Sequence, residues 1–242
     1  MKSHGEASPE HLLIAAGEVK KLCDTYGLTM IGLQPFLFYE GLTDRNEHAR
    51  KIEKLKLWFR IVKLLGTDII QIPTNFLTEN VTGDMDLIVQ DMVEIVDLGL
   101  QENPPVRFVY EILAWGTYID TWYQMWEVAK RVGRPNFGCC VDMFNIAGRA
   151  WADPASITGT TPNTTSDLKE SIERLVRMVD VQKFFYIQAV DAKRILSPLT
   201  EGHPFHVEDG QHVCPGAEMC DFSYTSKKGP DIPLSSMLLA QF

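Results

Sequence analysis

Short apolar segments recur along the chain at intervals of roughly 40 residues, and this spacing restricts the fold more than any other feature. They begin near residues 28, 68, 107, 136 and 184, and they are apolar on both faces. The segments between them have helical periodicity, and Gly27, Gly66 and Gly133 stand where helices are expected to end. Strands with two apolar faces are typical of a parallel sheet covered by helices. The pattern therefore predicts an α/β fold, either a doubly wound sheet or an eightfold barrel.

Capping residues and apolar periodicity set the expected helix boundaries. We expect helices over residues 9–26, 50–65, 85–98, 121–132 and 167–179. Asp84 is placed to cap the third helix, with Gly99 after its end, and Asp167 with Glu170 resembles a capping box for the last. Two segments lack this regularity. Residues 143–166 form a long polar stretch of the kind that covers active sites, and the alternation of helix and strand stops after about residue 210.

Charge and cysteine content exclude several classes of protein. Lys and Arg total 23 against 32 Asp and Glu, and the net charge is -9. Nonspecific binding to nucleic acid or to anionic lipid requires a cationic surface, so neither partner is expected. No apolar stretch is long enough to cross a bilayer, and the polar N-terminus lacks a secretory signal core. The five cysteines fit no zinc-ribbon spacing, and Cys139 and Cys140 lie in an apolar run, which indicates buried reduced thiols and a cytoplasmic protein.

Each predicted strand ends in an acid or an amide. These residues are Gln34, Gln71, Glu111, Asp142 and Gln188. Because the carboxyl ends of parallel strands meet at one edge of a sheet, we expect these side chains to share a crevice. Glu111, Asp142 and Gln188 come from three consecutive strands and offer oxygen ligands for a hard divalent cation such as Mg²⁺ or Mn²⁺. The alternative is that such a carboxylate only caps a helix or turn, as Asp142 could do for the segment after it.

Other polar side chains are weaker candidates. Lys193 and Arg194 follow the last strand, where they could bind a substrate carboxylate or form only a solvated pair. His203 and His206 stand three residues apart in an irregular region, which favours surface histidines over metal ligands. His48 lies in a polar context, and we expect it to be solvated. The sequence contains no phosphate-binding or dinucleotide-binding glycine loop and no nucleophile elbow.

Four segments carry a resemblance to a known family. They are residues 110–116 (YEILAWG), 134–138 (RPNFG), 141–146 (VDMFNI) and 185–192 (FYIQAVDA). In these segments the chain resembles the fungal 3-dehydroshikimate dehydratases of quinate catabolism. Those enzymes are members of the sugar-phosphate isomerase/epimerase superfamily, with a xylose-isomerase-like barrel. The resemblance covers residues from about 9 to 210.

The resemblance implies an activity and a metal site. It implies a carbon–oxygen lyase that uses a divalent metal to convert 3-dehydroshikimate into protocatechuate and water. Family members hold the metal with a Glu, an Asp, a Gln or His, and a final Glu. Glu111, Asp142 and Gln188 match the first three of these ligands. Gln34 and Gln71, at the ends of the two preceding strands, are then expected to contact the substrate.

The resemblance leaves the general base unassigned. Relatives in the superfamily often carry a histidine three residues after the metal-binding Asp, and Asn145 stands at that position here. Asn145, Lys193 and Arg194 are therefore candidates for contacts with the substrate, without an assigned role in proton transfer.

The chain departs from the family at both ends. Family members begin with a strand–helix unit that this chain lacks, and they continue through two further strands, the last of which supplies the fourth ligand. The fold expected over residues 1–210 is therefore an incomplete TIM (β/α)8-type barrel, followed by an irregular tail over residues 211–242. Residues 214–219 (CPGAEM), reverse-translated and read one base earlier, can encode the sequence expected of the family. We therefore interpret the tail as an out-of-frame extension.

Two other functions fit the same resemblance. The chain could be a truncated, non-catalytic remnant, whose open sheet edges and apolar surface would favour association into homo-oligomers. It could also be a sugar isomerase or epimerase of the same superfamily, although Trp115 and Gly116 argue mildly against that substrate pocket. The quoted segments favour the dehydratase, acting on a small-molecule substrate.

Overall fold

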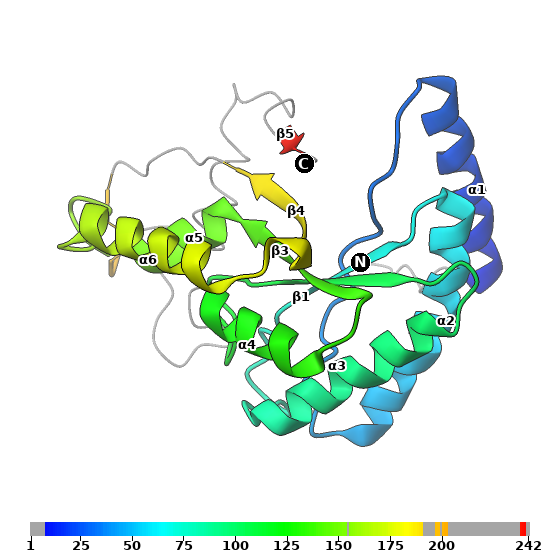
Figure 1. The fold of residues 1–242 in the computed structure, drawn as a ribbon, viewed down its shortest axis with the longest axis horizontal. Coiled ribbons are helices and arrows are strands. Elements are labelled where there is room, and N and C mark those ends of the chain that lie inside the picture. The colour runs from blue at the N-terminus through cyan, green and yellow to red at the C-terminus, as the bar shows by residue number, and fades with distance from the viewer. Residues whose placement is uncertain (1–7, 154, 191–196, 199, 203–237, 241–242) are drawn as a thin grey trace.

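A computed structural model describes residues 8–153, 155–190, 197–198, 200–202 and 238–240 of the chain. These residues build a five-stranded sheet with the order β1-β2-β3-β4-β5 (Figure 1). The strands are β1 (Ile69–Pro73), β2 (Arg107–Glu111), β3 (Phe137–Asp142), β4 (Phe184–Ala189) and β5 (Leu238–Ala240). The first four are parallel to one another, and β5 is antiparallel to β4. From β1 to β4, neighbours in sequence are therefore neighbours in the sheet, as in a continuous series of βα units.

Helices connect the strands of the described part of the chain. They are α1 (Pro9–Thr25), α2 (Arg45–Leu65), α3 (Met85–Leu100), α4 (Trp122–Val132), α5 (Met143–Ala150), α6 (Thr164–Met178) and the short 3₁₀ helix η1 (Val181–Lys183). α3 and α4 pack against each other and against β2, on the same side of the sheet (Figure 1). None of the helices among the described residues has the length and hydropathy needed to cross a membrane.

Local capping signals set several helix ends where the sequence predicts them. At the start of α3, the Asp84 side chain accepts hydrogen bonds from the backbone N–H groups of Asp86 and Leu87. Gly66 and Gly133 end α2 and α4 in the left-handed conformation, which glycine adopts without steric cost.

Two helix starts differ from the prediction. α2 begins at Arg45 and not near residue 50, because Asp44 caps it by accepting from the N–H groups at the start of its first turn. α6 begins at Thr164, so Asp167 and Glu170 lie inside the helix and the predicted capping box is wrong.

Two segments also differ from their expected conformation. The stretch over residues 143–166 begins as a helix, α5, and is not a loop throughout. Asp142 starts this helix by accepting from the N–H groups of Phe144 and Asn145. The strand expected over residues 28–33 is reduced to a single parallel bridge between Leu33 and Ile70.

The larger apolar cluster lies between the sheet and its helices. Phe108, Tyr110, Phe137 and Cys139 face it from the strands. Gly99 lies inside α3, and the prediction that it follows the end of that helix is wrong. A β-carbon at Gly99 would stand 2.6 Å from the Phe108 ring, so glycine lets α3 pack closely against β2 at this point.

A smaller apolar cluster lies on the opposite face of the sheet. It consists of Ile69, Val109, Cys140 and Tyr186, one residue from each of β1 to β4. β1, β2 and β3 therefore bury side chains on both faces, as predicted for a covered parallel sheet, whereas β4 is only partly buried. Cys139 and Cys140 point to opposite faces and are both buried free thiols, as their apolar context predicts.

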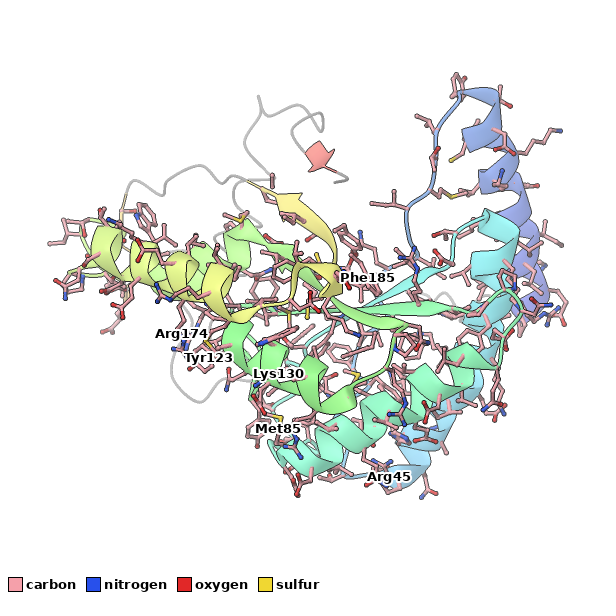
Figure 2. The ribbon with its side chains drawn as sticks, in the orientation of Figure 1. Arg45, Met85, Tyr123, Lys130, Arg174 and Phe185 are labelled. Carbon is pink, nitrogen blue, oxygen red and sulfur yellow. The ribbon has the colours of Figure 1, made fainter. Side chains whose placement is uncertain are left out.

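α6 packs beside α4 at one end of the sheet. The Trp122 indole N–H donates to the Ser171 hydroxyl at 2.9 Å. Figure 2 shows Arg174 of α6 next to Tyr123 of α4, and the guanidinium carbon lies 5.0 Å from the centre of the tyrosine ring. Apart from β5, the tail predicted over residues 211–242 lies outside the described residues, so its proposed reading frame is not tested by the structure.

Candidate metal centre

The alternation of side chains along the strands brings four polar residues to one face of the sheet. Gln71, Glu111, Asp142 and Gln188 each lie two residues after a member of the smaller apolar cluster, on β1, β2, β3 and β4 in turn. Side chains two residues apart in a strand point to the same face, so these four form the next layer toward the carboxyl ends of the strands. Asp142 and Gln188 are direct neighbours in the register of β3 and β4.

Three of these side chains converge on one another. One terminal atom of the Gln188 amide lies 3.0 Å from Asp142 Oδ2 and 2.6 Å from Glu111 Oε1. With the amide nitrogen at that position, Gln188 donates a hydrogen bond to each carboxylate. With the amide oxygen there, three oxygen atoms from three strands face one another, which is the arrangement that a cation would require.

Each of the two carboxylates is held through its other oxygen. Asp142 Oδ1 accepts from the backbone N–H groups of Phe144 at 2.7 Å and Asn145 at 3.4 Å. Glu111 Oε2 accepts a short hydrogen bond from the Gln71 side-chain amide. Asp142 is therefore a helix cap through one oxygen and a candidate ligand through the other, so the two interpretations of its place in the sequence do not compete.

Burial makes this pair of carboxylates costly to ionise without a counter-charge. Burial and the nearby Asp142 charge raise the pKa of Glu111 to about 8, although the Gln71 hydrogen bond opposes the rise. Burial also raises the pKa of Asp142, against the lowering effect of the Phe144 and Asn145 N–H groups. A divalent cation between them would supply the missing positive charge.

The residues present fit a hard divalent cation. Glu111 Oε1, Asp142 Oδ2 and the Gln188 amide oxygen are donors of the kind that Mg²⁺ and Mn²⁺ prefer. Among the described residues, no third His, Cys, Asp or Glu joins Glu111 and Asp142 in a metal-binding group, and Mg²⁺ commonly keeps several water ligands. The structure thus brings the three predicted ligands together, and their binding of a metal ion stays a prediction.

The other residues predicted for the site are not among the three side chains that converge. Gln34 is exposed and follows the bridge residue Leu33. Asn145 is 1% exposed, and its side-chain oxygen accepts from the Ala114 N–H at 2.9 Å, which ties the start of α5 to the loop after β2. Contacts of Gln34 and Asn145 with a substrate remain predictions. Lys193 and Arg194 lie outside the described residues.

The loop after β1 forms hydrogen bonds with the backbone at Glu111 and just after it, which the sequence did not predict. The backbone N–H of Thr74 donates to the Glu111 carbonyl at 2.8 Å, and the Thr74 hydroxyl accepts from the Leu113 N–H at 2.9 Å. No periodicity marks such a contact, because it joins residues about 40 positions apart in the sequence. The one available signal was a hydroxyl residue directly after an apolar strand.

A buried acid next to this loop was also missed. Glu40 accepts hydrogen bonds from the Asn75 N–H at 2.5 Å and from the Tyr110 hydroxyl at 3.1 Å. Burial raises the pKa of Glu40 to about 8. Glu40 bonds to Tyr110, whose side chain lies in the larger apolar cluster, so it is on the other side of the sheet from Glu111.

A second group of side chains could hold a metal ion. His48 on α2 and Asp91 and Glu94 on α3 have ligand atoms within 4.8 Å of one another. His48 is 4% exposed, so the prediction that it is solvated is wrong. Arg45 pairs with Asp91 at 2.9 Å, and Figure 2 shows Arg45 among the helices and away from β4, where Phe185 is labelled. An arginine already balances this carboxylate, so the strand-end group is the better metal candidate.

A known protein family matches most of this chain. The family model described as "Xylose isomerase-like TIM barrel" matches residues 7–228. The chain belongs to the xylose isomerase-like TIM barrel family. Membership decides between the two folds that the sequence pattern allows, in favour of the barrel. The described residues hold four parallel strands of such a barrel.

Curated relatives of this family member share one printed name. A "3-dehydroshikimate dehydratase" of Neurospora crassa is 44% identical over 235 residues, which cover 96% of this chain and 66% of the relative. A protein of the same name from Pseudomonas aeruginosa is 27% identical over 184 residues, or 76% of this chain and 25% of the relative. The chain thus spans slightly less than two thirds of the fungal relative and a quarter of the bacterial one.

Solved structures show the same fold at low sequence identity. A xylose isomerase-like TIM barrel/4-hydroxyphenylpyruvate dioxygenase fusion protein has a TM-score of 0.58 and 23% identity, covering 78% of this chain and 25% of that one. The IOLI protein, solved with a zinc atom, has a TM-score of 0.55 and 19% identity, covering 89% and 70%. One structure with a similar fold was thus solved with a bound zinc atom.

Proposed function

We propose that this member of the xylose isomerase-like TIM barrel family is a metal-dependent dehydratase that converts 3-dehydroshikimate into protocatechuate and water. The observation that carries the proposal is the convergence of Glu111 Oε1, Asp142 Oδ2 and the Gln188 amide on one point. The 44% identity to a fungal protein of that name supports the choice of substrate. The proposed activity is that of a carbon–oxygen lyase of quinate catabolism.

The proposed site gives each residue a defined task. A divalent cation, when bound, supplies a Lewis acid that polarises the ketone of the substrate. Glu111, Asp142 and Gln188 would hold that cation, each from the end of a different strand. Glu111 and Asp142 are buried, so little water contacts their carboxylates and their electrostatic interactions are stronger.

The reaction balances as the loss of one water molecule. A ring carbon next to the ketone loses its proton, and a neighbouring carbon loses its hydroxyl group. The proton and the hydroxyl leave as water, which gives a ring that still carries the ketone and a CH2 group. One proton then leaves that CH2 carbon and another is added to the ketone oxygen, with no further net loss, and the ring becomes aromatic. Asn145 has no titratable group and holds the Ala114 N–H, so we give it a positioning task and no proton transfer. We keep Gln34, Lys193 and Arg194 as candidates for contacts with the substrate hydroxyl and carboxylate groups.

A direct assay tests the proposal. The purified chain is treated with a chelator and then given 3-dehydroshikimate with no metal, Mg²⁺ or Mn²⁺, while the absorbance of protocatechuate is followed. We expect product only with a divalent metal. A chain that binds the metal but forms no protocatechuate would contradict the dehydratase. It would favour the non-catalytic remnant, or a sugar isomerase or epimerase if a sugar substrate were converted instead.

The setting of the enzyme is also a proposal. The buried free thiols of Cys139 and Cys140 suit a reducing compartment, so we propose a cytoplasmic enzyme. Its proposed partner is the small-molecule substrate, and homo-oligomers remain a prediction that a sedimentation experiment can check.

A further inference from the structure

Gln71 makes an unusual contact for a residue first expected to bind substrate. Its side chain is 2% exposed, and its amide nitrogen donates to Glu111 Oε2. The two residues come from neighbouring strands, because Gln71 pairs with Val109 and Pro73 pairs with Glu111 in the register of β1 and β2. In this register Gln71 lies opposite the residue two positions before Glu111, and its side chain is on the same face of the sheet as the Glu111 side chain.

Because of this contact, the two oxygens of the Glu111 carboxylate have different partners. Oε2 is taken by Gln71, and Oε1 faces the Gln188 amide at 2.6 Å. Asp142 is divided in the same way, with Oδ1 on the N–H groups at the start of α5 and Oδ2 facing Gln188. The two free oxygens point at one place because the other two are fixed. In metal sites, such outer hydrogen bonds orient the ligands and tune metal affinity.

The other end of the Gln71 amide shows that folding stability alone does not explain the residue. Gln71 Oε1 is buried and has no hydrogen-bond partner among the described residues. A buried acceptor without a donor costs folding free energy, and an apolar side chain of similar size would avoid that cost. The amide therefore calls for a reason beyond stability, and its contact with Glu111 supplies one.

We propose that Gln71 is a positioning residue, which holds Glu111 through Oε2 so that Oε1 is presented to a divalent cation. This inference rests on the proposed metal centre. It replaces the expected substrate contact of Gln71 with an indirect role, in which Gln71 touches a metal ligand and not the metal.

The test compares metal affinity with metal-free stability in the full chain. The variant Gln71→Met keeps the length and volume of the side chain and removes both amide atoms. We expect Mn²⁺ to bind 10- to 100-fold more weakly than to the wild type, as measured by calorimetric titration after chelation. We expect the melting temperature in chelator to change little, because removal of the unpaired acceptor offsets the loss of the donor to Glu111 Oε2. The variant Gln71→Asn keeps the amide on a shorter side chain and should also bind Mn²⁺ more weakly.

Asn136 provides a matched control. It is another buried amide with an unpaired oxygen, but its nitrogen donates to the Val96 and Val106 carbonyls at 2.9 Å, at the opposite end of the sheet from the site. Asn136→Ala should lower the melting temperature and leave Mn²⁺ affinity unchanged. Gln71 variants that bind Mn²⁺ as tightly as the wild type would overturn the positioning role. A wild-type chain that binds no Mn²⁺ would overturn the proposed metal centre itself.

Discussion

Replacing Glu111 by glutamine should change how the stability of the metal-free protein depends on pH. The pKa of Glu111 is about 8 in the folded protein, against an ordinary value of 4.5. Between these values the unfolded chain loses the proton while the folded chain keeps it, so the folded state binds more protons. The contribution of Glu111 to the free energy of unfolding of the protein therefore falls as the pH rises from about 4.5, and it stops falling above about 8.

The size of this effect follows from the two pKa values. Each pH unit between them removes about 1.4 kcal/mol of stability, so the loss reaches about 3 kcal/mol at pH 7 and about 5 kcal/mol above pH 8. The variant Glu111→Gln has no proton to lose at this position. It should be spared a loss on the order of a few kcal/mol, which is a large part of the stability of a typical domain.

Urea unfolding at pH 5, 6, 7 and 8 measures this difference, first in chelator and then with saturating Mn²⁺. Metal binding requires ionised Glu111, so Mn²⁺ should restore the stability of the wild type at high pH. Glu111→Gln should show a flatter pH dependence in chelator and little response to Mn²⁺.

Glu40 is the matched control for this experiment. It is a buried glutamate whose pKa is also raised to about 8 by burial, but it lies on the other side of the sheet. Glu40→Gln should also flatten the pH dependence in chelator, and it should keep the full response to Mn²⁺. The reasoning is refuted if Glu111→Gln follows the wild-type pH dependence, or if Glu40→Gln loses the Mn²⁺ response.

Three further substitutions test single contacts. Asp142→Asn keeps a capping oxygen for α5 but removes the charge, so calorimetry should show Mn²⁺ binding at least 10-fold weaker with a metal-free melting temperature that does not fall; equal binding would contradict the ligand role. Gly99→Ala should cost roughly 1–3 kcal/mol in urea unfolding, because its β-carbon would stand 2.6 Å from the Phe108 ring, and an unchanged midpoint would show that α3 can move away. Asn145→Ala leaves the buried Ala114 N–H without its acceptor and should cost about 1–3 kcal/mol in the same assay; a loss of product formation at unchanged stability would point instead to a substrate contact.

Features that depend on neighbouring residues could be predicted from the sequence. Asp84, Gly66 and Gly133 act at helix ends, because a cap needs only the residues next to it. The strand over residues 28–33 was predicted too long, since pairing depends on a partner strand that local composition does not reveal. The start of α5 was missed because Asp142 was considered as either a helix cap or a metal ligand. In the structure one carboxylate oxygen caps α5, and the other faces the Gln188 amide.

In the candidate site, too, some features could be predicted from the sequence and others could not. The positions of Glu111, Asp142 and Gln188 at strand ends predicted that they converge, because parallel strands in register bring their ends together. The contact between Gln71 and Glu111 could not be predicted, since it depends on the register of β1 against β2 and on the face that each side chain takes. A shift of one residue in that register would point Gln71 to the helical side of the sheet.

A crystal of the chain grown with Mn²⁺ and measured for anomalous scattering tests the metal centre most directly. We predict one strong peak about 2 Å from Glu111 Oε1, Asp142 Oδ2 and the Gln188 amide oxygen, with Gln71 still bonded to Glu111 Oε2. A peak only beside His48, Asp91 and Glu94, or no peak at either group, would contradict the account.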